Sequence, residues 1–438
     1  MSSRVLKRTR RPRSELDPEG PSFMSRDEAV AALAIKPSTL YTYVSRGLVR
    51  SIPTDGSRLR LFSRVDVEDL MVRSKCHEGG AARAQSAMRY GEPIITTSIT
   101  KITPQGPAYR GRAAIDLATA GVTFEAVSHL LWRGMLPENR VWRAAFPSIS
   151  PERLVSALQI PLPAEDVLKL FSTIVLALGF PDKKIRGEGS EDTIARAEAI
   201  IQTLASCCGF VARPASFFRP VTGDTIAMTV ARALNATDLD AAALLVNAAL
   251  ILCADMELTP GTFVARVASS AGSDVHACVA AGILVHSGCG GGQASYSCEA
   301  FLMGGELTVE QKLAWARKQG LRLPGFYDRI FPEGDPRAKA LIDMIKENLP
   351  LSKRACSTLS LIERVEIECN AKAGIAAALV VLSAALDLPR HSAAALWALG
   401  RVAGQVAHVI EQRSQGFLLR PRARYESSHQ TEAVETHI

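Results

Sequence analysis

The sequence has few aromatic residues for its length. Phenylalanine, tyrosine and tryptophan make up 6% of its 438 residues, whereas apolar residues as a whole reach 47%, with alanine and leucine abundant. This balance disfavours a sandwich of short strands and predicts a main body of packed helices. A chain of this length can bury one large core and also form a small accessory domain.

Closely spaced cysteine pairs and long apolar runs are also lacking. The nine cysteines form no CxxC motif, and Cys207 and Cys208 are adjacent, so they cannot form an unstrained bridge with each other. No charged leader precedes an apolar stretch, and the most apolar runs, such as residues 241–254, are too short to cross a bilayer. We therefore expect reduced thiols, no membrane partner and a cytoplasmic location.

The basic charge is concentrated at the N-terminus. Residues 1–90 contain 17 Lys and Arg against 10 Asp and Glu, which accounts for the whole net charge of +7. A basic segment of this kind suits a partner with a phosphate backbone, although a solvated basic tail has the same composition. We expect residues 1–22 to form a disordered basic arm, because they contain too few apolar residues to fold.

The next residues predict a small domain over 23–75. Ser25 followed by Glu28 forms a capping-box pattern at the start of a first helix, and a break at Lys36-Pro37 leads into a second helix from Ser38. Two short strands around Asp55-Gly56 predict a hairpin, and a closing helix follows Ser63.

This order of elements, carried by SRDEAVAALAIKPSTLYTYVSRGLVR, resembles the MerR-type winged helix-turn-helix. The resemblance implies that the second helix enters the major groove of DNA and that wing arginines contact phosphates. The alternative is a domain that has lost DNA binding and serves in packing or dimerisation. The DNA-contacting residues implied are Ser38, Tyr41, Arg46, Arg58 and Arg60.

A Gly/Ala/Arg-rich linker at 76–90 leads into the main body at 91–425, and the polar residues 426–438 predict a mobile tail. Four segments of the main body, in the same order, resemble the citrate synthase family: AYRGRAAIDLATAGVTFEAVSHLLWRGMLP, ADMELTPGTFVARVASSAGSDVHACVAAGI, LPGFYDRIFPEGDPRAKAL and ALWALGRVAGQVAHVIEQRSQGFLLRPRARY. The resemblance implies an all-α homodimer with a large and a small helical lobe. It also implies an oxo acid or citrate-like ligand together with acetyl-CoA or another acyl-CoA, and no permanently bound cofactor or metal.

The family's condensation removes a proton from a methyl group and stabilises an enol, for which its members use an Asp base and two His. In SGCGGGQ, Gly291, or Gly290 with a one-residue deletion, occupies the first His position, and Asp328 in LPGFYD occupies the second. The position of the base is Lys372 if NAKAGI is aligned with the family, or Glu366 in an alternative alignment. A carboxyl or a lysine can replace these groups only if its pKa is strongly shifted.

The residues that bind the dicarboxylate in the family are matched more closely. Arg337, Arg401 and Arg420 fall at its arginine positions, the last reaching in from the partner subunit, and forked guanidinium groups suit carboxylates. Ordinary surface or salt-bridge arginines are the alternative interpretation. Met256 occupies a substrate-binding His position and cannot donate a hydrogen bond to a carboxylate.

The remaining motifs favour structural roles. His286 lies close to the glycine cluster and could in principle turn toward the site, but a histidine near the end of an apolar helix is more often a core or cap residue. His129 and His408 are interpreted as structural for the same reason. The GCGGGQ run lacks the Lys-Ser/Thr ending of a nucleotide-binding loop.

Four hypotheses about function follow from these patterns. The first is a citrate synthase homologue with impaired condensation that still binds an oxo acid or acyl-CoA. The second is an active acyltransferase that uses Asp328 with Glu366 or Lys372. The third is a metabolite-sensing regulator that binds DNA through its N-terminal domain. The fourth is a mixed dimer with an intact paralogue.

Overall fold

The computed structural model describes residues 23–45, 48–53, 60–64, 66–67, 70, 94–138, 141–145, 147–181, 189–288, 292–305, 307–319, 323–328 and 330–421. The chain divides into two units. The N-terminal unit comprises Met1–Thr96, Thr308–Leu323 and Ile367–Ala371, and the main unit comprises Thr97–Leu307, Pro324–Glu366 and Lys372–Ile438.

The N-terminal unit contains the helices α1, α2 and α15 and a three-stranded antiparallel sheet in the order β1-β3-β2. The predicted cap at the first helix is confirmed: the Ser25 hydroxyl accepts from Glu28 N at 3.3 Å, and the Glu28 carboxylate accepts from Ser25 N at 2.9 Å. Side chains of α1, α2, β1 and β3 pack into a separate core that includes Leu33, Leu40 and Phe62. The elements are β1 (Phe23–Met24), α1 (Arg26–Leu33), α2 (Pro37–Ser45), β2 (Ser51–Pro53), β3 (Arg60–Ser63) and α15 (Val309–Gln319).

Several predictions about the termini and the hairpin lie outside the described residues. These are the basic arm at 1–22, the hairpin turn at Asp55-Gly56, the linker at 76–90 and the tail at 426–438. Most of the helix expected after Ser63 is outside them too, so these features stay predictions.

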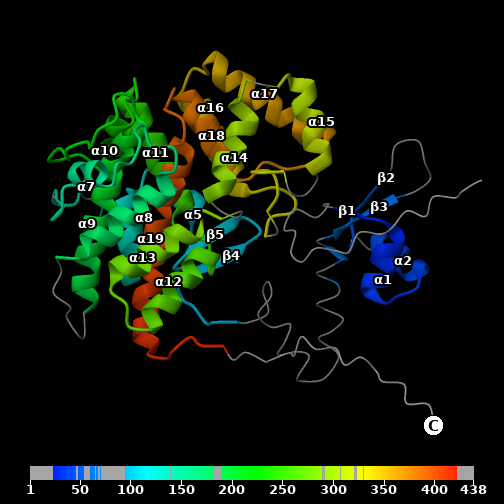
Figure 1. Cartoon of the computed structure of the whole chain (residues 1–438), viewed down its shortest axis with the longest axis horizontal. Coiled ribbons are helices and arrows are strands. Elements are labelled where there is room, and N and C mark those ends of the chain that lie inside the picture. Colours follow the sequence, from blue (N-terminus) through cyan, green and yellow to red (C-terminus); the bar gives the residue numbers. More distant parts are fainter. Residues whose placement is uncertain are drawn as a thin grey trace, which may run out of the picture. The chain divides into compact units, whose positions relative to one another are not determined.

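The main unit is almost entirely helical, as the composition predicts (Figure 1). A small antiparallel sheet opens it, with strands β4 (Thr100–Thr103), β5 (Gly106–Tyr109) and β6 (Arg112–Ala113) in that order. The helices are α5 (Ala114–Thr119), α6 (Phe124–Arg133), α7 (Pro151–Ala157), α8 (Val167–Leu178), α9 (Ser190–Cys207), η1 (Cys208–Val211), α10 (Ile226–Ala233), α11 (Leu239–Cys253), α12 (Pro260–Ser270), α13 (Val275–Val285), α14 (Gly292–Met303), α16 (Pro336–Asn348), α17 (Lys353–Glu368), α18 (Ile375–Ala385) and α19 (Ser392–Gln415).

The long helix α19 is the centre of this unit. It packs against α9, α11, α12, α13, α14 and α18, and Figure 1 shows it running through the middle of the bundle. It and the segment Ser190–Val211 are long and apolar enough to cross a membrane, but 94% and 78% of their apolar windows are buried within the fold. Their apolar character is therefore explained by core packing.

One face of α19 nevertheless carries polar side chains. Arg401, Gln405, His408 and Gln412 are spaced by three or four residues, so they align along the helix, and all four are buried. Next to this stripe, Gly404 N donates to Ala254 O at 3.0 Å, which brings α19 directly against the end of α11. A buried polar stripe needs partners or a ligand, and it points to the site described next.

Candidate anion-binding site

Arg337 lies in the first turn of α16 and is 2% exposed. Its Nε and Nη2 donate to the two oxygens of Asp335 at 3.0 and 2.8 Å, and its guanidinium lies 5.8 Å from the centre of the Phe331 ring. Burial lowers the pKa of Arg337, but the Asp335 carboxylate outweighs burial and raises it above its ordinary value. Among the described residues, Arg337 Nη1 has no hydrogen-bond partner.

Arg401, on α19, is equally buried at 2% exposure. It is held by a ring and not by a carboxylate, because its guanidinium lies 5.3 Å from the centre of the Trp397 ring one turn earlier on the helix. Burial and the charge of Arg337 lower the pKa of Arg401, while Asp255 opposes them. In the part of the chain that the structure describes, neither Nε nor Nη1 of Arg401 has a partner.

The groups between the two arginines are buried as well. Cys253 ends α11 and is affected by the charges of both Arg337 and Arg401, although burial prevails and raises the pKa of its thiol to about 11. Tyr109 donates from its hydroxyl to Ile251 O at 2.9 Å and accepts from Asp255 N at 3.2 Å, which ties β5 to the end of α11. The site is therefore walled by fixed side chains.

Asp255 supplies the negative charge that balances Arg401. Its side chain is 0% exposed, and its Oδ2 is in contact with His408 Nε2 at 3.3 Å. Burial raises the pKa of this carboxyl, but His408 and Arg401 lower it by more, so the pKa falls below its ordinary value. Asp255 is thus ionised, and it leaves Arg401 Nε and Nη1 without a hydrogen-bond partner.

Among the described residues, the two buried arginines have three N–H-bearing nitrogens without a hydrogen-bond partner. Arginine donates and does not accept, so a group that binds these nitrogens must offer acceptor oxygens, and negative charge strengthens the bonds. A carboxylate satisfies both requirements with charge-assisted bonds. The burial of Arg337 and Arg401 does not fit the alternative of surface arginines, but the ion pair of Arg337 with Asp335 does fit the alternative of a salt-bridge arginine. Substrate binding by these two arginines therefore stays a prediction.

Asp328 is the predicted catalytic position that lies nearest to these arginines. Its Oδ2 is 3.8 Å from Arg337 Nη2, and its Oδ1 accepts from Ile330 N at 2.8 Å. Its side chain is 29% exposed.

Lys372 and Glu366, the two alternatives for the base, contact each other. Lys372 Nζ lies 3.9 Å from Glu366 Oε2, and the lysine side chain is 46% exposed. Glu366 Oε1 accepts from Ala373 N at 2.9 Å, which fixes the loop before α18. The Lys372 side chain is therefore not enclosed by the fold, whereas a lysine that acts as the base would need a desolvated position.

Two of the other three predicted positions, Met256 and Arg420, are described and lie on other segments than Arg337 and Arg401. Met256 is buried beside Asp255 in the turn between α11 and α12. Arg420 is exposed on the segment after α19, where Leu419 N donates to the Ser270 hydroxyl at 3.1 Å. Gly291 lies outside the described residues, just before α14.

The three histidines of the sequence argument are all buried. His129 contacts Glu198 at 2.8 Å and lies between two tryptophan rings. His286 packs edge-on against Trp397 with ring centres 4.4 Å apart, and burial lowers its pKa to about 3, with a further contribution from Arg401. His408 lies closer to the anion site than its predicted structural role implies, since it touches Asp255 directly.

Sequence reasoning missed Trp397, Asp255 and Arg266 as parts of this site. The sequence spacing could have indicated Trp397, because it precedes Arg401 by four residues on a predicted helix and so lies on the same face. Asp255 precedes the substituted Met256 but carries no spacing motif. Arg266 reaches the site only through the packing of α12 on α19, which no local pattern reveals.

In the N-terminal unit, the exposed face of α2 contains Ser38 and Tyr41, which is 45% exposed and packs edge-on against Phe62. Arg60 is exposed on β3 and donates to the Ser51 hydroxyl at 3.0 Å. Arg46 and Arg58 lie outside the described residues.

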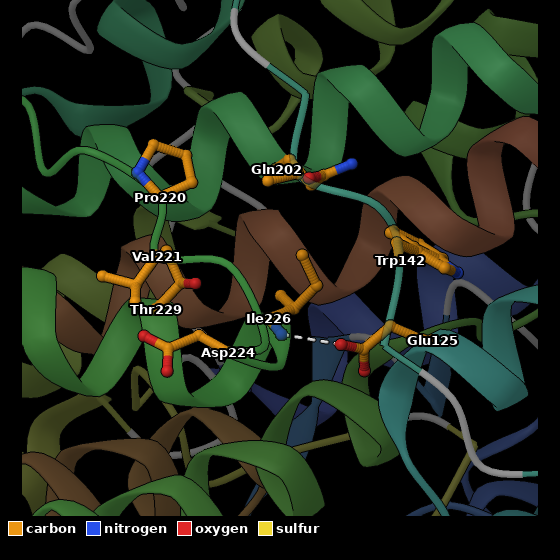
Figure 2. A pocket seen from close by; sticks show the side chains of 9 residues that line it. Glu125, Trp142, Gln202, Pro220, Val221, Asp224, Ile226 and Thr229 are labelled. Carbon is orange, nitrogen blue, oxygen red and sulfur yellow. Dashed lines mark hydrogen bonds between the residues drawn. The ribbon is translucent and has the colours of Figure 1, made fainter.

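A pocket lies between α6, α9 and α10 and contains none of the predicted site residues (Figure 2). Three buried side chains line it with a polar atom that has no partner among the described residues: Glu125 Oε2, Gln202 Nε2 and Trp142 Nε1. The other carboxylate oxygen of Glu125 accepts from Ile226 N at 2.7 Å, at the start of α10. Across the described residues, no cluster of three or more His, Cys, Asp or Glu side chains could hold a metal ion.

Glu125 gives the protein a pH-dependent stability. Burial raises the pKa of this carboxyl from 4.5 to about 7, so above pH 4.5 the unfolded chain loses a proton that the folded chain retains. The free energy of unfolding therefore falls as the pH rises from about 4.5 to 7, by about 3 kcal/mol relative to Glu125→Gln, and is level above that. Denaturant unfolding of both proteins across this range measures the difference. The exposed control Glu165→Gln follows the wild type, and parallel curves for wild type and Glu125→Gln contradict the assignment.

Comparison with known proteins identifies the fold and the family. The family model "Citrate synthase, C-terminal domain" matches residues 89–422. A citrate synthase from Mycolicibacterium smegmatis is 24% identical over 367 residues, covering 78% of this chain and 96% of the relative. A 2-methylcitrate synthase from Shewanella oneidensis is 26% identical over 364 residues, covering 79% and 94%.

Solved structures agree with this result at the level of the fold. The ternary complex of carboxymethyl coenzyme A and oxaloacetate with citrate synthase from Thermoplasma acidophilum superposes with a TM-score of 0.67 at 22% identity, covering 78% of this chain and 96% of that one. Citrate synthase from Thermotoga maritima gives 0.62 at 24% identity, with the same coverage. From residue 89 to residue 422, the chain belongs to the citrate synthase family.

Proposed function

We propose that this protein is a ligand-binding member of the citrate synthase family that holds a dicarboxylate oxo acid between Arg337 and Arg401 and condenses it with acyl-CoA poorly or not at all. One observation carries the proposal: Arg337 Nη1 and Arg401 Nε and Nη1 are buried donors that have no hydrogen-bond partner within the described part of the chain. An unsatisfied buried charged group costs several kcal/mol, so such an arrangement is retained where a ligand completes it.

The relatives support the choice of ligands. The Thermoplasma enzyme was solved with oxaloacetate and a coenzyme A analogue, so oxaloacetate is the first oxo acid to test and acetyl-CoA the first thioester. Relatives that are 2-methylcitrate synthases extend the test to acyl-CoA thioesters other than acetyl-CoA. We propose a homodimer for this chain as well, in which the exposed Arg420 completes the partner's site.

The proposed loss of turnover follows from the residues at the matched positions. Glycine at 291 offers no side chain, Asp328 lies 3.8 Å from the Arg337 guanidinium, and Lys372 is half exposed. These residues differ from the Asp base and the two His with which the family transfers protons. The active-enzyme alternative relies on Asp328, and unchanged turnover in Asp328→Ala would exclude it.

Isothermal titration of the full chain with oxaloacetate tests binding directly. We expect saturable binding by the wild type and none by Arg337→Met combined with Arg401→Met, with Arg390→Met on the surface as the control. Absence of oxaloacetate binding to a folded wild type would overturn the proposed function.

DNA binding is a second candidate function, favoured by the separate core of the N-terminal unit. That core buries one face of α2, while Ser38 and Tyr41 remain exposed on the other, next to a strongly basic sequence. Fluorescence anisotropy should show that the wild type binds duplex DNA at low salt and that its affinity falls steeply as salt is added. Tyr41→Ala should lower the affinity at low salt by more than about 10-fold relative to the wild type. No binding at low salt would exclude this function.

Co-purification from the native host tests the proposed mixed dimer with an intact paralogue.

A further inference from the structure

Arg266 has the most extensive set of contacts near the anion site, although it does not touch the ligand position. It lies on α12, is 0% exposed, and directs its nitrogens at the polar stripe of α19. Nε donates to Gln412 Oε1 at 2.9 Å, Nη2 donates to Gln415 Oε1 at 2.7 Å, and Nη1 reaches both Glu411 Oε2 at 2.8 Å and His408 Nδ1 at 3.1 Å.

The contact with His408 determines where the imidazole carries its proton. A guanidinium can only donate, so His408 Nδ1 must accept and cannot hold a hydrogen. The proton of the neutral ring is therefore on Nε2, which lies 3.3 Å from Asp255 Oδ2 and donates to it. A doubly protonated ring would direct a hydrogen at Arg266, so Arg266 selects one tautomer of His408.

Asp255 links His408 to the anion site. Its Oδ2 also accepts from Glu257 N at 3.1 Å, so the carboxylate is fixed from two sides. It lies against α19 at Gly404, three residues after Arg401, where an added Cβ would be 2.3 Å from Asp255 Oδ1. The position of Asp255 therefore fixes both the charge balance and the placement of Arg401.

We propose that Arg266 is a positioning residue for the anion site, which it controls by fixing the His408 tautomer that holds Asp255 beside Arg401. The inference rests on the proposed function for its effect on ligand binding, but not for the tautomer itself. Arg266 also joins the site to the segment that carries Arg420, because Gln412, which it contacts, donates to Phe417 O at 2.9 Å.

The full chain labelled with 15N-histidine provides the first test. Long-range 1H–15N spectra should show a His408 resonance, identified by its loss in His408→Gln, with its proton on Nε2. In Arg266→Met and in the charge-keeping Arg266→Lys this resonance should shift toward a mixture of the two tautomers, whereas the surface control Arg354→Met leaves it unchanged. An unaltered Nε2–H tautomer in both folded Arg266 variants would overturn the proposal, whatever the ligand.

Titration with oxaloacetate and with acetyl-CoA provides the second test. The Arg266 variants and His408→Leu should bind oxaloacetate about 10-fold more weakly, with acetyl-CoA affinity within about twofold of wild type. His408→Gln should retain most of the affinity, because its amide offers one acceptor and one donor group. Equal losses for both ligands, or no rescue by glutamine, would show that Arg266 supports the fold only. Failure of the wild type to bind oxaloacetate would contradict the proposed function. The spectra would then still test whether Arg266 fixes the tautomer of His408.

Discussion

Replacing Arg401 with methionine should weaken oxaloacetate binding by about 100-fold or more. The side chain is buried, stacks on Trp397 and keeps Nε and Nη1 available, so it can form a bidentate bond with a carboxylate without being reorganised. Removing one partner of a buried, hydrogen-bonded charge pair costs about 2–5 kcal/mol in binding, and each 1.4 kcal/mol is a factor of ten. Isothermal titration measures the loss.

Two further variants separate charge from geometry at this position. Arg401→Lys keeps the positive charge that balances Asp255 but loses the planar guanidinium that can donate two bonds to one carboxylate. It should therefore bind oxaloacetate more tightly than Arg401→Met does, and it should preserve the fold. Arg390→Met, on the surface just before α19, should bind like the wild type. Wild-type affinity in a folded Arg401→Met protein would show that the ligand does not use this arginine.

Replacing Gly404 with alanine should destabilise the protein by about 2 kcal/mol, even though alanine is the better helix former. The added Cβ would lie 2.3 Å from Asp255 Oδ1 and 2.4 Å from Ala254 O. Neither atom can move freely, because Asp255 is held by His408 and Ala254 O accepts from Gly404 N. Overpacking costs about 1–3 kcal/mol or more, and the gain of about 1 kcal/mol in helix propensity offsets only part of it.

Chemical denaturation followed by circular dichroism measures this change. Gly305→Ala is the matched control, since a Cβ there meets nothing within 4 Å, and it should alter the free energy of unfolding by less than about 0.5 kcal/mol. Equal stability of the two variants would mean that α19 does not approach Asp255 as closely as described.

The sequence predicted the fold through its periodicity and its motifs. The helical main body follows from low aromatic content and from four family segments in order, and the cap at Ser25 follows from a local pattern that the structure confirms. Arg337 and Arg401 could also be matched, because GDPRA and ALGRVAG are short and distinctive. The domain boundaries and the DNA-contacting residues remain predictions.

The connections between these residues could not be predicted. His408 is 142 positions from Arg266 and 153 from Asp255 in the sequence, and only the packing of α12 and α11 on α19 brings them together. His408 was therefore interpreted as a core histidine, since nothing local reveals the arginine that selects its tautomer. In the same way, Lys372 aligns with a catalytic position in sequence, but only the fold shows that its side chain is half exposed.

Release of coenzyme A from acetyl-CoA in the presence of oxaloacetate, measured with purified wild-type protein that has been shown to bind oxaloacetate, tests the central claim most directly. We expect no release above the rate without protein, because the anion-binding arginines are present and the groups at the proton-transfer positions are unsuited to that task. Turnover on the usual enzymatic scale of about 1–1000 per second would contradict the account.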